Sequence, residues 1–147
     1  MRRGLFLVAI VAGIAGWFGV QHAAAEREPV SGGKAMFRAV VHINFDDADR
    51  QKHGLKNVTN MLKEVKTGDI EVVCHGAGIG LLVKEKTKRP DEIAELMKQG
   101  VKFAGCENTL KEKSIPKESL LPGVTTVPSG AVEVVRKQQD GFGYFRP

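Results

Sequence analysis

Several kinds of residue are scarce in this 147-residue chain, and each scarcity excludes a class of protein. Two cysteines are too few for a disulfide-dense small protein or for a thiolate-rich zinc site. Aromatic residues make up only 6% of the chain, and they form no platform with basic residues that would bind nucleic acid. Only one apolar run, residues 4–20, approaches the length of a membrane span, which excludes a polytopic membrane protein.

Common cofactor and catalytic patterns are missing as well. Residues 76–80 (GAGIG) resemble a dinucleotide-binding loop, but that pattern requires its third glycine at the position of Leu81. No serine lies in a nucleophile elbow, and the spacing of the histidines matches no zinc motif. We therefore expect neither a nucleotide cofactor nor a bound metal.

The first 25 residues have the three parts of a secretory signal peptide. Arg2 and Arg3 precede the apolar run, and small residues end the segment at Ala25. This pattern predicts cleavage near Ala25 and export to the periplasm or out of the cell. The alternative is an uncleaved N-terminal membrane anchor, because the run is at the lower end of spanning length, about 17 residues.

Cleavage also changes the charge. It removes two arginines, so the formal net charge falls from +5 to +3. The remaining basic residues alternate with acidic ones, which is typical of solvated helix faces. We expect no nucleic-acid partner and, after cleavage, no stable insertion into a membrane.

The rest of the chain alternates between strand and helix patterns. Residues 26–34 are polar and predict a flexible lead-in, and residues 35–147 predict a single α/β domain. Strands are expected over 35–44, 70–75, 101–105, 124–127 and 142–146. Helices are expected over 48–66, 90–99, 107–113 and 129–139, with a short helix or turn at 81–83. This order predicts a parallel sheet in a three-layer α/β/α arrangement.

In an open parallel sheet, ligands bind beyond the carboxyl ends of the strands. That rule selects a set of candidate site residues: Asn44, Cys74, His75, Cys106, Asn108 and Thr109. Cys106 lies where a strand turns into a helix, and the first N–H groups of a helix stabilise a thiolate. The neighbouring Glu107 would act in the opposite direction and raise the pKa of the thiol. A reactive thiol and a half-buried structural cysteine both remain open at this point.

The other candidates also allow two interpretations each. Cys74 lies inside a predicted strand, where it packs as a small hydrophobic residue or forms a disulfide with Cys106 if the two strands are neighbours. His75 orients or deprotonates a ligand, or it is a turn histidine bonded to the backbone. We expect His42 to be a core residue and His53 to lie on a solvated helix face.

Several segments, taken together, carry a family resemblance. They are residues 40–44 (VVHIN), 73–78 (VCHGAG), 100–110 (GVKFAGCENTL), 121–130 (LPGVTTVPSG), 134–139 (VVRKQQ) and 143–147 (GYFRP). In order and spacing the chain resembles the DsrE/DsrF-like family of sulfur-relay proteins, and specifically its small exported members. The resemblance implies a five-stranded parallel sheet in the order 4-3-2-1-5, which would bring His75 near Cys106.

The resemblance also implies a function. In sulfur-relay members, a cysteine in the region of the third strand carries sulfur as a persulfide, and only Cys106 matches that position. It further implies a homo-oligomer, a trimer or hexamer, and a protein partner that donates or accepts sulfur. A sulfur carrier or binding protein is expected rather than a turnover enzyme. The alternatives are a non-catalytic oligomeric module that holds a small ligand at the strand ends, and a disulfide-bearing scaffold.

Overall fold

The computed structural model describes residues 36–65 and 68–147. The predicted signal peptide, residues 1–25, and the predicted lead-in, residues 26–34, lie outside this part of the chain. Within it, no helix combines the length and the hydropathy needed to cross a membrane.

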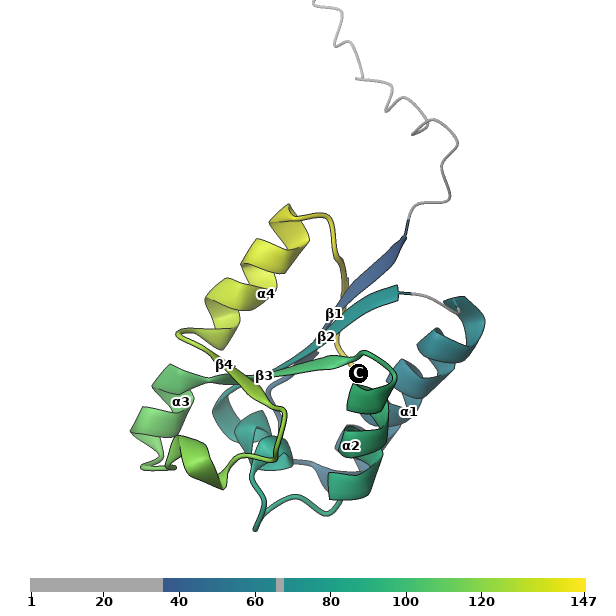
Figure 1. Cartoon of the computed structure of the whole chain (residues 1–147). Coiled ribbons are helices and arrows are strands. Elements are labelled where there is room, and N and C mark those ends of the chain that lie inside the picture. The colour runs from purple at the N-terminus through teal and green to yellow at the C-terminus, as the bar shows by residue number, and fades with distance from the viewer. Residues whose placement is uncertain (1–35, 66–67) are drawn as a thin grey trace, which may run out of the picture. The chain divides into compact units, whose positions relative to one another are not determined.

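Five parallel strands form one sheet in the order β4-β3-β2-β1-β5 (Figure 1). Their bounds are Phe37–Ile43 (β1), Gly68–Cys74 (β2), Lys102–Cys106 (β3), Thr125–Val127 (β4) and Gly143–Phe145 (β5). All five strands predicted from the sequence are present, and the parallel sheet within an α/β fold is confirmed. The strand order is the one that the resemblance implies, so β2 and β3 are neighbours.

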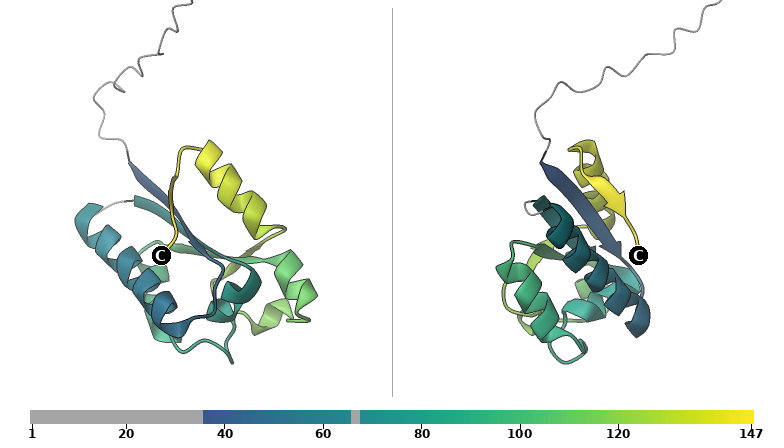
Figure 2. Two further views of the ribbon diagram at one scale, coloured as in Figure 1. Left: turned by 180° about the vertical axis from the view of Figure 1, so that it is seen from behind. Right: turned by 90° about the vertical axis from the view of Figure 1, so that its right-hand side faces the viewer.

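Helices cover both faces of the sheet (Figures 1 and 2). They are α1 (Ala48–Val65), η1 (Gly76–Leu82), α2 (Pro90–Lys98), α3 (Glu107–Glu112), η2 (Lys117–Ser119) and α4 (Gly130–Gln139), where η marks a 3-10 helix. The helices α1 and α2 lie on one face, and α4 lies on the other. Ser129 caps α4 by accepting a hydrogen bond from the N–H of Val132, as a serine at that position predicts.

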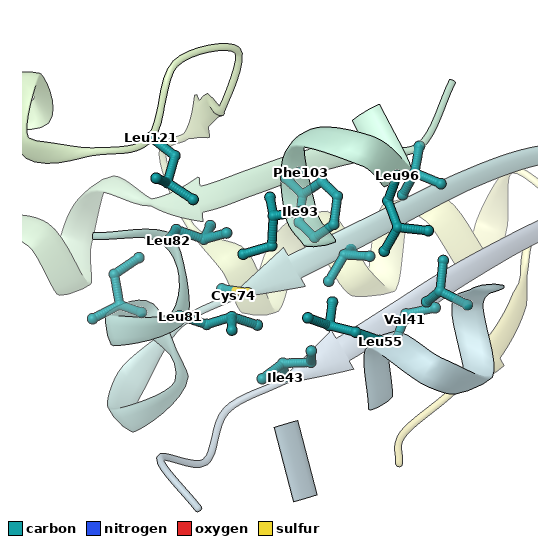
Figure 3. Packing of buried hydrophobic residues seen from close by; sticks show 14 of the residues in the cluster. Val41, Ile43, Leu55, Cys74, Leu81, Leu82, Ile93, Leu96, Phe103 and Leu121 are labelled. Atoms are coloured by element: carbon teal, nitrogen blue, oxygen red, sulfur yellow. The ribbon is translucent and has the colours of Figure 1, made fainter. Parts of the chain in front are cut away.

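The main hydrophobic core lies on the face covered by α1 and α2 (Figure 3). Val41 and Ile43 of β1 pack there with Leu55 of α1 and Phe103 of β3, and none of these side chains is more than 1% exposed. Burying one such side chain stabilises the fold by about 2 kcal/mol.

A smaller apolar cluster lies on the opposite face, beneath α4. Its buried members are Val40, Val73, Ala104, Val134 and Phe142. A single helix covers this face, so polar side chains can occupy it near the carboxyl ends of the strands.

Two predicted boundaries are wrong. β2 begins at Gly68, two residues before the strand expected at residues 70–75. The short helix expected at residues 81–83 begins earlier, at Gly76. Gly78 permits this early turn, because a Cβ atom there would lie 2.2 Å from the carbonyl oxygen of Ile43.

Candidate functional site

Three polar side chains project from neighbouring strands on the face covered by α4. They are His42 on β1, His75 directly after β2, and Cys106 at the end of β3. On each of these strands, the residue two positions earlier belongs to the apolar cluster beneath α4. Side chains alternate along extended backbone, and His75 and Cys106 both have extended backbone angles, so all three residues share that face.

The sulfur of Cys106 is surrounded by hydrogen-bond donors. Burial by itself raises the pKa of this thiol, but four donor groups near the sulfur outweigh the effect of burial. The donors are the hydroxyl of Thr109 and the backbone N–H groups of Gly130, Thr109 and Asn108. As a result the pKa of Cys106 is lowered from its ordinary value, because the donors favour the thiolate.

A second hydrogen bond fixes the direction in which the hydroxyl of Thr109 donates. The N–H of Gly76 donates to Oγ1 of Thr109 at 3.0 Å. With its oxygen already accepting this bond, the hydroxyl can direct its own hydrogen toward the sulfur of Cys106. Thr109 is 5% exposed, so water does not compete for this position.

Gly130, the first residue of α4, allows the helix to approach both the thiol and His75. A Cβ atom on Gly130 would lie 2.9 Å from Cβ of His75 and 3.2 Å from Cβ of Cys106. Any other residue would push these side chains away from the helix. The absence of a side chain at Gly130 therefore brings an α4 N–H group, the thiol and an imidazole together.

A chain of hydrogen bonds runs from His75 toward solvent. Nε2 of His75 lies 2.6 Å from Nε2 of His42, and Nδ1 of His42 lies 2.8 Å from the hydroxyl oxygen of Tyr144. The two imidazole rings stack, with their centroids 4.7 Å apart. Tyr144 is 46% exposed, so the chain connects the interior of the site to the surface of the domain.

Both histidines of this chain favour the neutral state. Burial, and to a smaller extent the charges of His75 and Arg146, lower the pKa of His42 to about 4. Burial also lowers the pKa of His75. At neutral pH the two rings therefore contact each other without carrying charge.

The structure brings some of the predicted site residues together and separates others. His75 and Thr109 lie beside Cys106, as described above. The side chain of Asn44 is engaged elsewhere, because its amide oxygen accepts hydrogen bonds from Arg146 at 2.9 and 3.2 Å. The side chain of Asn108 is exposed, and only its backbone N–H group helps to lower the pKa of the thiol.

Sequence reasoning missed three members of the site. The expectation that His42 is a core residue is wrong, because it is only partly buried and bonds to His75 and Tyr144. His42 and Asn44 are polar residues two positions apart in an otherwise apolar strand, and this pattern could have indicated that His42 faces the site. Tyr144 becomes a neighbour through the pairing of β5 with β1, and Gly130 through the docking of α4, and neither contact leaves a local sequence pattern.

Cys74 lies on the other side of the sheet. It packs in the core beneath α1 and α2 and is 0% exposed (Figure 3). Burial strongly raises the pKa of its thiol. Cys74 is paired in register with Gly105, so its side chain and that of Cys106 point to opposite faces, and both thiols are free. The alternative of a disulfide between them, and with it the disulfide-bearing scaffold, is contradicted.

The expectation that Glu107 raises the pKa of the thiol is also wrong. The carboxylate of Glu107 forms an ion pair with Lys117 and accepts a hydrogen bond from Thr126 at 2.6 Å. The bonds from Lys117 and Thr126 lower the pKa of Glu107 itself, and the net effect of the surroundings of Cys106 is to lower the pKa of its thiol.

Metal-ligating side chains do not converge in the part of the chain that the structure describes. No three histidine, cysteine, aspartate or glutamate side chains gather there closely enough to hold an ion. The chemistry available to these residues is that of a stabilised thiolate beside a neutral pair of imidazoles.

The fold and the site define a class: a single parallel α/β domain with a stabilised thiol at the carboxyl edge of its sheet. The chain belongs to the DsrE/DsrF-like family, whose model matches residues 38–147. Comparison with curated proteins found no match.

Solved structures support the same assignment. The protein of unknown function MTH1491 from Methanobacterium thermoautotrophicum is 36% identical, with a TM-score of 0.73 over 76% of this chain and 99% of that one. The ychN protein from E. coli is 13% identical, with a TM-score of 0.66 over 76% and 100%. The conserved protein of unknown function BT1422 from Bacteroides thetaiotaomicron is 15% identical, with a TM-score of 0.62 over 74% and 93%. The last two share the fold.

Proposed function

We propose that this protein carries sulfur as a persulfide on Cys106, taking it from a donor and passing it to an acceptor thiol. The observation that carries the proposal is the position of Cys106 at the end of β3 against Gly130 of α4, where nearby donor groups lower the pKa of its thiol. A thiolate is the form that attacks a sulfur atom, and it is also the group that must leave when the sulfur is passed on. Stabilising the thiolate favours both steps.

The direct test is the mass of the purified protein after incubation with polysulfide. We expect a gain of about 32 Da, the mass of one sulfur atom, located on the peptide that contains Cys106. Cys106→Ser removes the gain, and the matched control Cys74→Ala keeps it, since Cys74 lies in the core on the opposite face. A wild-type protein that takes up no sulfur, or one that takes it up equally after Cys106→Ser, contradicts the proposal.

The second candidate function is a non-catalytic module that holds a small ligand at the strand ends. One observation supports it: a cleft of about 310 Å³ lies beyond the ends of β1 and β2. Its lining residues are Asp46, Gln51, Ala77, Ile79, Gly80, Lys86 and Lys113. This candidate predicts that ligand binding survives Cys106→Ser, because the cleft does not include the thiol.

The proposal includes a setting and partners. We infer that residues 1–25 direct export and that the carrier works in the periplasm or outside the cell, as a homo-oligomer that meets a sulfur-donor or sulfur-acceptor protein. The exposed valines of α4, Val132 and Val135, are 52% and 53% exposed and support contact with another chain. Measurement of the mass of the intact exported protein and of its assembly in solution tests this part.

A further inference from the structure

We propose that Tyr144, His42 and His75 form a proton wire that carries a proton from solvent to the outer sulfur held on Cys106. This inference rests on the proposed sulfur-carrying function. Two imidazoles and one phenol form an unbroken series of hydrogen-bond contacts, which begins at the exposed ring of Tyr144 and ends at His75, next to the thiol. A stable fold does not require such a connection.

The hydrogen bonds couple the proton positions of the three side chains. Because both rings are neutral, the contact between Nε2 of His42 and Nε2 of His75 contains one proton. If His42 donates in that contact, its Nδ1 accepts from Tyr144, and Nδ1 of His75 carries a proton. If His75 donates, Nδ1 of His42 donates to Tyr144, and Nδ1 of His75 is bare. The far nitrogen of His75 is therefore a donor in one arrangement and an acceptor in the other.

That far nitrogen is available to a substrate. Nδ1 of His75 has no hydrogen-bond partner among residues 36–65 and 68–147, whereas its Nε2 is engaged. His75 also stands next to the thiol, because a Cβ atom on Gly130 would lie 2.9 Å from Cβ of His75 and 3.2 Å from Cβ of Cys106. A persulfide places a second sulfur about 2 Å beyond Sγ, within the same part of the site.

The charged and titratable groups around the histidines are few. Tyr144 and Arg146 face them from β5 and the residues after it, and Cys106 faces His75 from β3. The helix α4 contributes the backbone of Gly130, and its charged side chains pair elsewhere, Lys137 with Glu71 and Glu133, and Arg136 with Glu133. Arg146 disfavours protonation of His42, so the positively charged state of the pair is suppressed and transfer through neutral rings is favoured.

The step balances without an oxidant or a reductant. The outer sulfur of the persulfide, as an anion, takes the proton of Nδ1 of His75. Nε2 of His75 then takes the proton of His42, Nδ1 of His42 takes that of Tyr144, and the phenolate oxygen takes one from solvent. The acceptor thiolate now attacks the neutral outer sulfur, a new S–S bond forms, the bond to Sγ breaks, and its electron pair stays on Cys106 as the stabilised thiolate.

Protonation matters because an anionic outer sulfur repels an anionic acceptor. His75 is the residue that touches the sulfur, and His42 and Tyr144 act through it as positioning residues. The wire predicts that discharge of the persulfide depends on all three residues, whereas loading of Cys106 does not.

The experiment compares loading and discharge in the purified full chain. Cys106 is loaded with polysulfide and then discharged to a small thiol, cysteamine, between pH 6 and 8. We expect His42→Gln and Tyr144→Phe to load like the wild type but to discharge at least about tenfold more slowly. The wild-type rate per acceptor thiolate should change little with pH, whereas the variant rates per acceptor thiolate should fall as pH rises and increase with the concentration of buffer acid. His53→Gln, on the exposed face of α1, is the matched control.

The possible failures are distinguishable. Equal loading shows that the variants are folded, so equal discharge rates with the wild-type pH and buffer dependence overturn the wire and leave the carrier function standing. A slower variant rate that does not respond to buffer acid also overturns the wire, because it indicates a structural effect. A wild-type protein that never loads overturns the carrier function and, with it, this inference.

Discussion

The two cysteines of this domain lie on opposite faces of one sheet, in environments that differ in depth and in polarity. Both are buried, Cys74 being 0% exposed and Cys106 5%. Around Cys74 there are only apolar side chains, and burial raises the pKa of its thiol. Around Cys106 there are four hydrogen-bond donors, and the pKa of its thiol is lowered although burial opposes this. Complete burial among apolar side chains raises the pKa of one thiol, and nearby donors lower the pKa of the other.

The two helical layers explain this difference. On the face of Cys74, α1, α2 and η1 close over the sheet with apolar side chains. On the face of Cys106, α4 arrives end-on through Gly130 and α3 starts directly after the thiol, so backbone N–H groups are directed at the sulfur. A helix whose side lies on the sheet contributes apolar contacts, whereas a helix whose first turn meets the sheet contributes backbone hydrogen-bond donors.

The largest expected effect is the difference in alkylation rate between the thiols. In the native protein at neutral pH we expect iodoacetamide to modify Cys106 at least about 10³-fold faster than Cys74, which becomes accessible only in the unfolded fraction. Peptide masses taken over time give both rates. In concentrated denaturant the two rates should become equal. Comparable rates in the native state would show that the two environments do not differ as described.

The next effect concerns stability. Cys74→Ser places a hydroxyl without a partner in the core and is expected to lower the free energy of unfolding by about 2 kcal/mol. Cys106→Ser places its oxygen among existing donors, so the expected loss is below about 1 kcal/mol. Urea denaturation of both variants checks this order. If Cys106→Ser is the more destabilising change, then the donors do not satisfy an oxygen at that position.

The smallest effect is a shift in the pKa of Cys106. Thr109→Val removes the hydroxyl that favours the thiolate, so the pKa of the thiol should rise. The alkylation rate measured against pH then has a higher midpoint, and less thiolate is present at neutral pH. Thr126→Val is the control, because Thr126 bonds to Glu107 and not to the thiol. An unchanged midpoint for Thr109→Val would remove Thr109 from the site.

Sequence reasoning predicted the fold well because hydrophobic periodicity and turn residues are local signals. The strands, the helices around them and the parallel sheet follow from such patterns, and Cys106 follows from the rule that sites lie at strand ends. The partners of Cys106 did not follow to the same extent. Thr109 is three residues away and was predicted, whereas Gly130 reaches the thiol through the docking of a distant helix.

The histidine chain is a second example of contacts that local sequence patterns do not predict. A histidine at position 42, inside an apolar strand, has no local feature that separates a core residue from a site residue. Its role depends on Tyr144, which is 102 positions away along the chain, and on the placement of β5 beside β1. Such contacts are decided by topology, so they become visible only once the strand order is known.

The position of β5 has a consequence for motion. It is three residues long, forms an edge of the sheet and pairs only with β1. Short edge segments are among the first parts of a domain to open, and opening here separates Tyr144 from His42. The surroundings of Cys106, built by β3, α3 and α4, stay in place during such an opening. Amide exchange in β5 should therefore be faster than in β3, and the thiol should remain protected while Tyr144 separates from His42.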